Sequence, residues 1–138
     1  MPASWLLKTE PKTYSFDRLL QEQRTTWDGV RNNLALQHLR AMKAGDRLLI
    51  YHSGADKAVV GTGKVVKAAY QDPSQDDPRV VVVDIAAEAR LPGPVSLAIL
   101  KADPELREFP LVRMPRLSVM PVPPEVWKRI VALGAGKA

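Results

Sequence analysis

Short apolar runs alternate along the chain with stretches in which apolar residues recur at helical spacing. The apolar runs are bounded by turn residues and predict strands over residues 4–9, 47–52, 59–66 and 80–85. Apolar residues three or four positions apart, each set preceded by a capping side chain, predict short helices after Ser15, Asn32, Ser96 and Asp103. Pro123-Pro124 opens a terminal helix that Gly134 ends.

Glycines and prolines indicate how this framework is shaped. Gly61 and Gly63 lie inside one strand and predict a bend or bulge there. Residues 70–78 read as a surface loop, and a last extended stretch over residues 111–119 is interrupted by Pro115, which places it at an edge or a bulge. Strands and helices follow no regular alternation, so we predict an α+β fold with a small, strongly curved sheet, in one domain spanning residues 1–138.

Composition narrows the function classes. With 46% hydrophobic and 25% charged residues the chain can fill a core, which excludes global disorder. It has no cysteine, which excludes disulfides, iron–sulfur clusters, zinc–thiolate sites and cysteine nucleophiles, and leaves His38 and His52 as imidazole ligands on different elements. We therefore expect no metal and no cofactor. A signal peptide and an apolar membrane span are not evident, so we expect a cytoplasmic monomer without a membrane partner.

The net charge of +5 is unevenly distributed. Residues 27–69 hold seven basic and three acidic side chains, and residues 111–138 hold five and one, so each block carries +4. Residues 70–110 hold four and eight, which gives −4. A polyanionic partner would therefore meet a face built from the two basic blocks, if folding brings them together; a mixed solvated surface is the alternative.

The segment from Trp27 to Asn32 carries the most informative chemistry. A tryptophan stands beside the Asp28-Gly29 turn, and Arg31 and Asn32 follow. An aromatic face can stack on a nucleobase, an amide can read its edge and a guanidinium can bind phosphate. Alternatively, Trp27 is a core residue beside an ordinary turn.

Three further clusters are candidates for binding. Tyr51 and Ser53 share one face of a strand and His52 takes the other, where it is a general base or a structural residue. Lys8, Thr9 and Glu10 at a strand end can contact a base or ribose, or form an exposed ion pair. Around the Pro115 bend, the set of polar side chains suits phosphate or forms a solvated basic edge; its members are Arg113, Arg116 and Ser118.

At these same residues the sequence resembles the EVE domain family. The matching strings run in family order from residue 5 to about residue 131: residues 5–11, 27–32, 42–46, 51–53, 69–70, 72–73, 94–95 and 116–122. The resemblance implies a PUA-like fold, a curled β-barrel of about five or six strands flanked by short helices. It also implies a pocket that holds a modified base, such as a methylated or hydroxymethylated one, in DNA or RNA.

The resemblance assigns roles residue by residue. Trp27 and Tyr51 would be pocket aromatics, and Gly29 would allow close backbone approach. The polar groups that would read the base are Lys8, Asn32, Ser53 and Ser118, with Thr9 and His52 beside them. Arg31, Arg113 and Arg116 would bind the nucleic-acid backbone.

We therefore expect a binding module for a modified nucleobase, without chemistry of its own. The phosphate-loop and hydrolase motifs are missing, and no metal set accompanies the pocket strings. Two alternatives stay open. One is a small enzyme acting on a nucleotide or modified base, with Glu10, Asp28 and His52 in acid–base roles; the other is a protein-interaction domain with a vestigial pocket.

Overall fold

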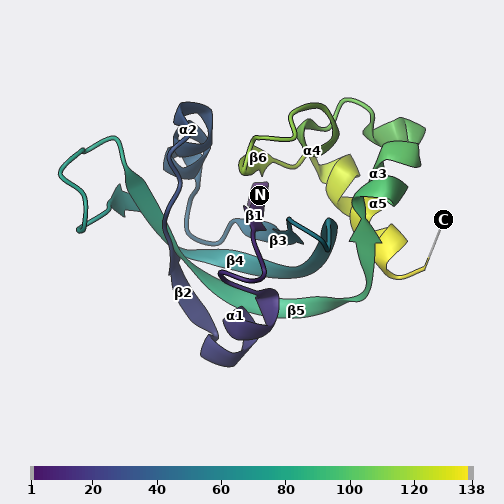
Figure 1. Ribbon diagram of the computed structural model, residues 1–138, viewed down its shortest axis with the longest axis horizontal. Coiled ribbons are helices and arrows are strands. Elements are labelled where there is room, and N and C mark those ends of the chain that lie inside the picture. The colour runs from purple at the N-terminus through teal and green to yellow at the C-terminus, as the bar shows by residue number, and fades with distance from the viewer. Residues whose placement is uncertain (1, 137–138) are drawn as a thin grey trace.

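A six-stranded, curled sheet organises the computed structural model, which describes residues 2–136 (Figure 1). The strands are β1 (Ser4–Thr9), β2 (Arg24–Trp27), β3 (Arg47–His52), β4 (Ala58–Gln71), β5 (Val81–Ser96) and β6 (Val119–Pro121). Their order is β2-β5-β4-β3-β1-β6, with β1 and β3 parallel and the other pairs antiparallel. The predicted α+β class and the curled sheet are confirmed, although β2 and β6 remain as two edges and do not close a barrel.

Short helices surround this sheet. They are α1 (Phe16–Glu22), α2 (Asn33–Ala41), α3 (Leu97–Ala102), the 3-10 turn η1 (Pro104–Leu106), α4 (Pro110–Arg113) and α5 (Pro124–Gly134). In Figure 1, α2 lies at the upper left, α1 below the sheet, and α3 and α5 together at the right. None of the helices within residues 2–136 has the length and apolarity needed to cross a membrane.

The predicted capping residues are confirmed. The Ser15, Asn32 and Ser96 side chains each accept a hydrogen bond from the backbone N–H three residues later, at 3.1, 3.0 and 3.1 Å. Asp103 caps the 3-10 turn by accepting from the N–H two residues later, that of Glu105, at 2.9 Å. These local contacts explain why the helix starts were readable from the sequence.

The two strand glycines permit close packing across the curled sheet. The register of β4 against β5 shifts between Val59 and Gly61 and again between Thr62 and Gly63, as a bulge requires. A Cβ on Gly61 would lie 2.2 Å from the Phe16 ring, so only glycine lets α1 pack this closely. The prediction of a bend at these positions is confirmed.

Three features differ from the sequence prediction. The extended stretch expected from residue 111 is wrong at its start, because Pro110–Arg113 is a helix; Pro110 supplies the fixed φ of a first helical position and Leu111 is buried. Strand β2 was not predicted. The strands β4 and β5 also run further than expected, β4 into the predicted loop to Gln71 and β5 through two prolines to Ser96, because their long mutual pairing stabilises these extensions.

Candidate functional site

A polar cavity of about 670 Å³ opens where the end of β1, the start of α1, the strand β2 and the segment before α2 meet. We call it the polar cavity. Its lining comprises Lys8, Thr9, Glu10, Thr13, Tyr14, Arg18, Glu22, Thr25, Thr26, Trp27, Asp28, Gly29, Val30, Arg31 and Ser118. Fourteen of the fifteen come from residues 8–31, and Ser118 joins them because β6 pairs with β1.

Two aromatic side chains form a wall of the cavity. Trp27 ends β2 and is only 7% exposed, so most of the indole belongs to the core. The Tyr14 ring meets it edge-on, with 6.1 Å between centroids and an interplanar angle of 89°. The residue therefore packs in the core, as the alternative reading expected, and it also lines the cavity; its role in stacking on a base stays a prediction.

Tyr14 is tied to helix α1 by a short polar network. Its hydroxyl donates to Glu22 Oε1 at 2.6 Å, and Arg18 donates from Nε to Glu22 Oε2 at 3.2 Å. Burial raises the pKa of the Tyr14 phenol, and the hydrogen bond to Glu22 raises it further. The same hydrogen bond lowers the pKa of the Glu22 carboxyl. The ring that faces Trp27 is therefore held in place by a neutral phenol and an ionised carboxylate.

Lys8 connects the cavity to the segment that precedes β6. Its ammonium donates to Pro115 O at 2.8 Å and lies 5.7 Å from the centroid of the Tyr51 ring. Its backbone N–H donates to Ser118 O at 3.0 Å, which places Ser118 beside it. Burial lowers the pKa of Lys8, because the ammonium is partly removed from water.

The charges around the cavity are balanced. Three cations line it, Lys8, Arg18 and Arg31, and so do three carboxylates, Glu10, Glu22 and Asp28. Within residues 2–136, the Asp28 carboxylate and the Ser118 hydroxyl form no hydrogen bond with another protein group. The cavity thus offers free acceptors and donors without an excess of positive charge.

The sequence-predicted residues divide into two sets. Those that line the cavity are Lys8, Thr9, Trp27, Gly29, Arg31 and Ser118. Those that do not are Asn32, Tyr51, His52, Ser53, Arg113 and Arg116. Gly29 has a φ of +78°, a conformation that favours glycine at this turn.

Several of the second set serve the fold or lie nearby. The Asn32 amide oxygen caps α2, and Tyr51 is 3% exposed, beneath Lys8. Ser53 donates its backbone N–H to Thr9 O at 2.9 Å. Arg113 pairs with Glu108 at 2.6 Å on the surface.

Both ring nitrogens of His52 form hydrogen bonds with neighbouring residues. Its Nε2 accepts from Phe16 N–H at 2.9 Å, so Nδ1 carries the proton and donates to Asp56 Oδ2 at 3.0 Å. The ring is buried and holds the start of α1 against the end of β3. This arrangement gives His52 a structural task away from the cavity.

Several cavity residues in the turn before α1, in α1 itself and in β2 were not predicted from the sequence. Tyr14, Glu22 and Thr25 are the clearest examples. A tyrosine in a loop just before a helix cap is only a weak indication of a binding site. The residues around Tyr14 in the sequence do not show that its ring contacts Trp27. Strand β2 was the missing information, since it brings Thr25 and Trp27 to the same wall.

A smaller hollow adjoins the polar cavity. It has a volume of about 340 Å³ and is lined by Asn32, Leu34, Met114, Pro115, Arg116 and Leu117. We call it the Leu34–Met114 hollow. The two spaces share a boundary, because Lys8 of the cavity donates to the carbonyl of Pro115, and Ser118 of the cavity follows Leu117.

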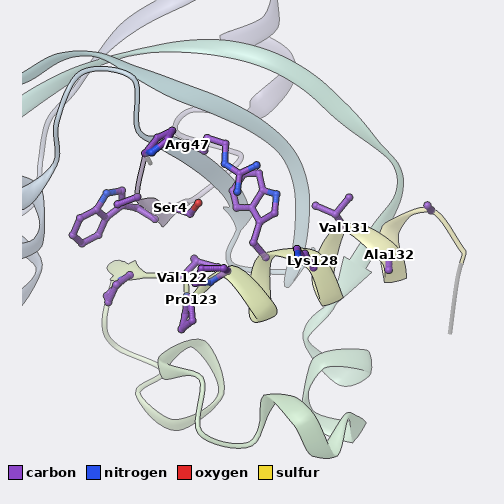
Figure 2. Close-up of a pocket in the computed structure, with 14 residues that line it drawn as sticks. Ser4, Arg47, Val122, Pro123, Lys128, Val131 and Ala132 are labelled. Carbon is purple, nitrogen blue, oxygen red and sulfur yellow. The ribbon is translucent and has the colours of Figure 1, made fainter.

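A third space, of about 800 Å³, lies between β1, the end of β6 and helix α5. We call it the apolar groove. Figure 2 shows Arg47 facing α5, along which Lys128, Val131 and Ala132 line the groove. The Arg47 guanidinium lies 4.2 Å from the Trp127 ring centroid, and the Trp5 indole N–H donates to Asp46 at 2.9 Å.

The basic blocks meet at more than one place. Arg31 and Ser118, from the first and second block, line the polar cavity, but Arg47 and Lys128 meet at the apolar groove. Folding therefore brings the two blocks together at two separate places, and not on the one face that a polyanionic partner would need, because the sheet order sends β3 and α5 to the groove side. Among residues 2–136, no three histidine, aspartate or glutamate side chains gather in a way that could hold a metal ion.

Comparison with known proteins gives consistent matches. The family model described as EVE domain matches residues 3–133. The NMR structure of Rpa0253 from Rhodopseudomonas palustris is 41% identical, covers 96% of this chain and 93% of its own, and superposes with a TM-score of 0.92. Thymocyte nuclear protein 1 from Rattus norvegicus is 32% identical over 94% of this chain and 72% of its own length.

A solved structure with a bound ligand is also similar. Human THYN1 protein, crystallised in complex with 5-methylcytosine containing DNA, is 31% identical to this chain. The match covers 96% of this chain and 97% of that one, with a TM-score of 0.87.

Proposed function

The chain belongs to the EVE domain family, and on that premise we propose that it binds a modified nucleobase of DNA in the polar cavity, without chemistry of its own. The observation that carries the proposal is a cavity of about 670 Å³ with an aromatic wall and balanced charges. A nucleobase is flat, neutral and edged with donors and acceptors, so it suits such a lining.

The charge balance favours a base over a phosphate inside the cavity. Three carboxylates would repel a phosphate group, whereas a carboxylate accepts well from the exocyclic amine of cytosine. Asp28 is the carboxylate free to do so. The phosphates would then lie outside the cavity, against the exposed guanidinium groups of Arg31, Arg113 and Arg116.

The apolar part of the lining suits a methyl substituent. Trp27, Val30 and the Tyr14 ring are its main apolar groups. Burying one methyl contributes about 0.8 kcal/mol, which corresponds to a preference of about fourfold over the unmodified base. The human relative supports 5-methylcytosine as the first ligand to test, because its structure contains DNA with that base.

A catalytic function has less support. Of the three residues considered for acid–base chemistry, Glu10 and Asp28 line the cavity but His52 does not. Both ring nitrogens of His52 are engaged, at 2.9 and 3.0 Å, so it has no free nitrogen to offer a substrate. Binding requires only the groups that the cavity presents.

Fluorescence anisotropy with short single-stranded oligonucleotides tests the proposal. Each oligonucleotide carries one cytosine, 5-methylcytosine or 5-hydroxymethylcytosine, and RNA versions form a second series. We expect tighter binding to the modified DNA, and a loss of affinity in Asp28→Asn and Ser118→Ala because both remove a cavity acceptor or donor.

Asp76→Asn is the matched control, because Asp76 is exposed on the loop between β4 and β5. Equal affinity of the wild type for all bases would contradict the proposal. Intact-mass measurement of the oligonucleotides after incubation tests the enzyme alternative, since any altered or released base changes the mass.

A further inference from the structure

The Leu34–Met114 hollow has an unusual surface for a small soluble domain. Three large apolar side chains within residues 2–136 are prominently exposed, Leu34 at 37%, Ile99 at 46% and Met114 at 44%. Two of the three, Leu34 and Met114, line the same hollow although they are 80 residues apart in sequence. Exposed apolar side chains gathered at one place mark a contact surface.

The hollow continues the wall of the polar cavity. Asn32 of the hollow follows Arg31 of the cavity, and Leu117 of the hollow precedes Ser118 of the cavity. The Lys8 ammonium also ties the two together through the carbonyl of Pro115, at 2.8 Å. The parts of a nucleic acid next to a base bound in the cavity would therefore lie close to Leu34 and Met114.

The charge around the hollow suits a polyanion. Arg116 lines it, Arg31 is exposed at the boundary, and no acidic side chain within residues 2–136 contributes to its lining. The polar cavity itself carries three carboxylates, so the positive potential lies at the hollow rather than inside the cavity. A nucleic-acid backbone would accordingly run past the hollow.

A base in a duplex must leave the stack before it can enter a cavity. Leaving costs unstacking and unpairing, a few kcal/mol, and opens a gap between the neighbouring base pairs. Proteins that distort duplex DNA insert side chains such as leucine, methionine or proline between base steps. Here all three residue types line the hollow next to the cavity, as Leu34, Met114 and Pro115.

We propose, resting on the base-binding function above, that Leu34 and Met114 form an apolar wedge that enters the stack of duplex DNA and fills the place vacated by the modified base. The hollow receives the edge of the adjacent base pair, and Arg116 binds a flanking phosphate. The polar cavity then selects the base, and the wedge decides whether the base can be taken from a duplex.

The test compares a matched duplex with a single strand of the same sequence, each carrying one 5-methylcytosine. The double variant Leu34→Ala with Met114→Ala should lose about tenfold in affinity for the duplex, because it lacks the side chains that offset unstacking. Its affinity for the single strand, whose base is already free, should change less than about twofold. Both side chains are only partly exposed, at 37% and 44%, so thermal unfolding is measured alongside to show that the double variant is folded in the binding assay.

Two controls separate the wedge from a general apolar effect. Ile99→Ala removes the third exposed apolar side chain, which lies on α3 and lines neither the cavity nor the hollow, and should leave both affinities unchanged. Met114→Leu, on an otherwise wild-type background, keeps an apolar wedge and should retain duplex binding.

A 2-aminopurine beside the target base reports unstacking directly. Its fluorescence should rise with the wild type, Met114→Leu and Ile99→Ala, and stay low with the double variant. Equal losses on duplex and single strand, or full duplex affinity in the double variant, would overturn the wedge. If the wild type showed no preference for 5-methylcytosine even in the single strand, the base-binding function itself would fail, which is a distinguishable result.

Discussion

The polar cavity and the apolar groove have similar volumes, about 670 and 800 Å³, and tryptophan contributes to the wall of each. They differ in what their polar groups do. Asp46 is buried beside the groove rather than in its lining, and it accepts from Trp5 Nε1, from Ala3 N–H and from Lys43 N–H, at 2.9 to 3.1 Å. In the cavity, Asp28 and Ser118 make no hydrogen bond with another protein group within residues 2–136.

This difference separates a structural hollow from a binding site. The buried Asp46 beside the groove stabilises the fold through its three hydrogen bonds, and the Arg47 guanidinium already lies over Trp127. Free polar groups at the cavity leave hydrogen-bonding capacity for a ligand. Volume alone would favour the groove as the binding site. The polar side chains that have no hydrogen-bond partner within residues 2–136 of the protein favour the cavity instead.

The largest effect on stability is expected at Trp27, which both packs in the core and lines the cavity. Trp27→Ala should lower the free energy of unfolding by about 3 to 5 kcal/mol, because it leaves a large void in the core. Loss of base binding in that variant would therefore not separate stacking from folding. Urea unfolding measures the first effect, and Trp27→Phe, which keeps an aromatic ring, is the variant for the binding measurement. A Trp27→Ala protein as stable as the wild type would contradict the buried position.

The next largest effect is expected from a substitution that destabilises the fold beside the groove and leaves the lining of the cavity unchanged. Asp46→Ala removes the acceptor of three hydrogen bonds at a residue that is 4% exposed, so we expect a loss of about 2 to 3 kcal/mol in urea unfolding. Asp46→Asn, which keeps an acceptor, should lose less. Under conditions where both variants are folded, affinity for the modified base should equal that of the wild type. A selective loss of affinity would instead make the groove part of the site.

A matched pair of lysines contrasts the two regions in binding. Lys8→Ala removes a cavity cation that also supports the Pro115 carbonyl, and should weaken oligonucleotide binding about tenfold. Lys128→Ala removes an exposed cation at the groove and should change affinity less than about twofold. Anisotropy at two salt concentrations measures both. Equal effects of the two substitutions would remove the distinction between the regions.

Lys8 should also determine how oligonucleotide affinity depends on pH in the alkaline range. Its pKa is lowered by burial, so the ammonium loses its proton at a lower pH than an ordinary lysine does. Affinity that depends on Lys8 should therefore decline as pH rises toward that lowered pKa. The Lys8→Ala variant should lack this decline.

The local part of the fold could be predicted from the sequence, and the assembled part could not. Ser15 and Asn32 cap helices through contacts three residues away, which a pattern can reveal. Strand β2 is four residues long and mostly exposed, and it exists because it pairs with β5 some 60 residues later. Thr25, Thr26 and Trp27 are of types that favour strands, but nothing within the segment tells which distant strand it pairs with.

The candidate site divides in the same way. Lys8, Trp27 and Ser118 were found through their motifs and line the cavity, but Tyr14 and Glu22 were missed. Their place depends on α1 folding back onto β2, a tertiary contact without a sequence signature. Conversely, Tyr51 carries a suitable side chain but is buried, because both faces of β3 are covered. Side-chain alternation along a strand does not reveal this.

The smallest effect concerns the network that holds Tyr14 against Trp27. Glu22 has a lowered pKa in the folded protein because Tyr14 donates to it, so the folded state binds its proton less tightly than the unfolded chain does. The resulting stabilisation is present above the unfolded pKa of the carboxyl and is lost as pH falls through the folded one.

Tyr14→Phe removes the donor while keeping the ring that meets Trp27 edge-on. We therefore expect the variant to lose part of the acid dependence of its stability, and to resemble the wild type once Glu22 is protonated in both. Urea unfolding from pH 6 down to pH 3 measures the difference, and Tyr70→Phe, whose hydroxyl donates to Asp84 outside the cavity, is the control for losing a phenol. A difference in the free energy of unfolding between Tyr14→Phe and wild type that is the same at every pH would show that Tyr14 does not lower the pKa of Glu22. The contrast between the cavity and the groove would then rest on the Asp28 carboxylate, which lies outside this network.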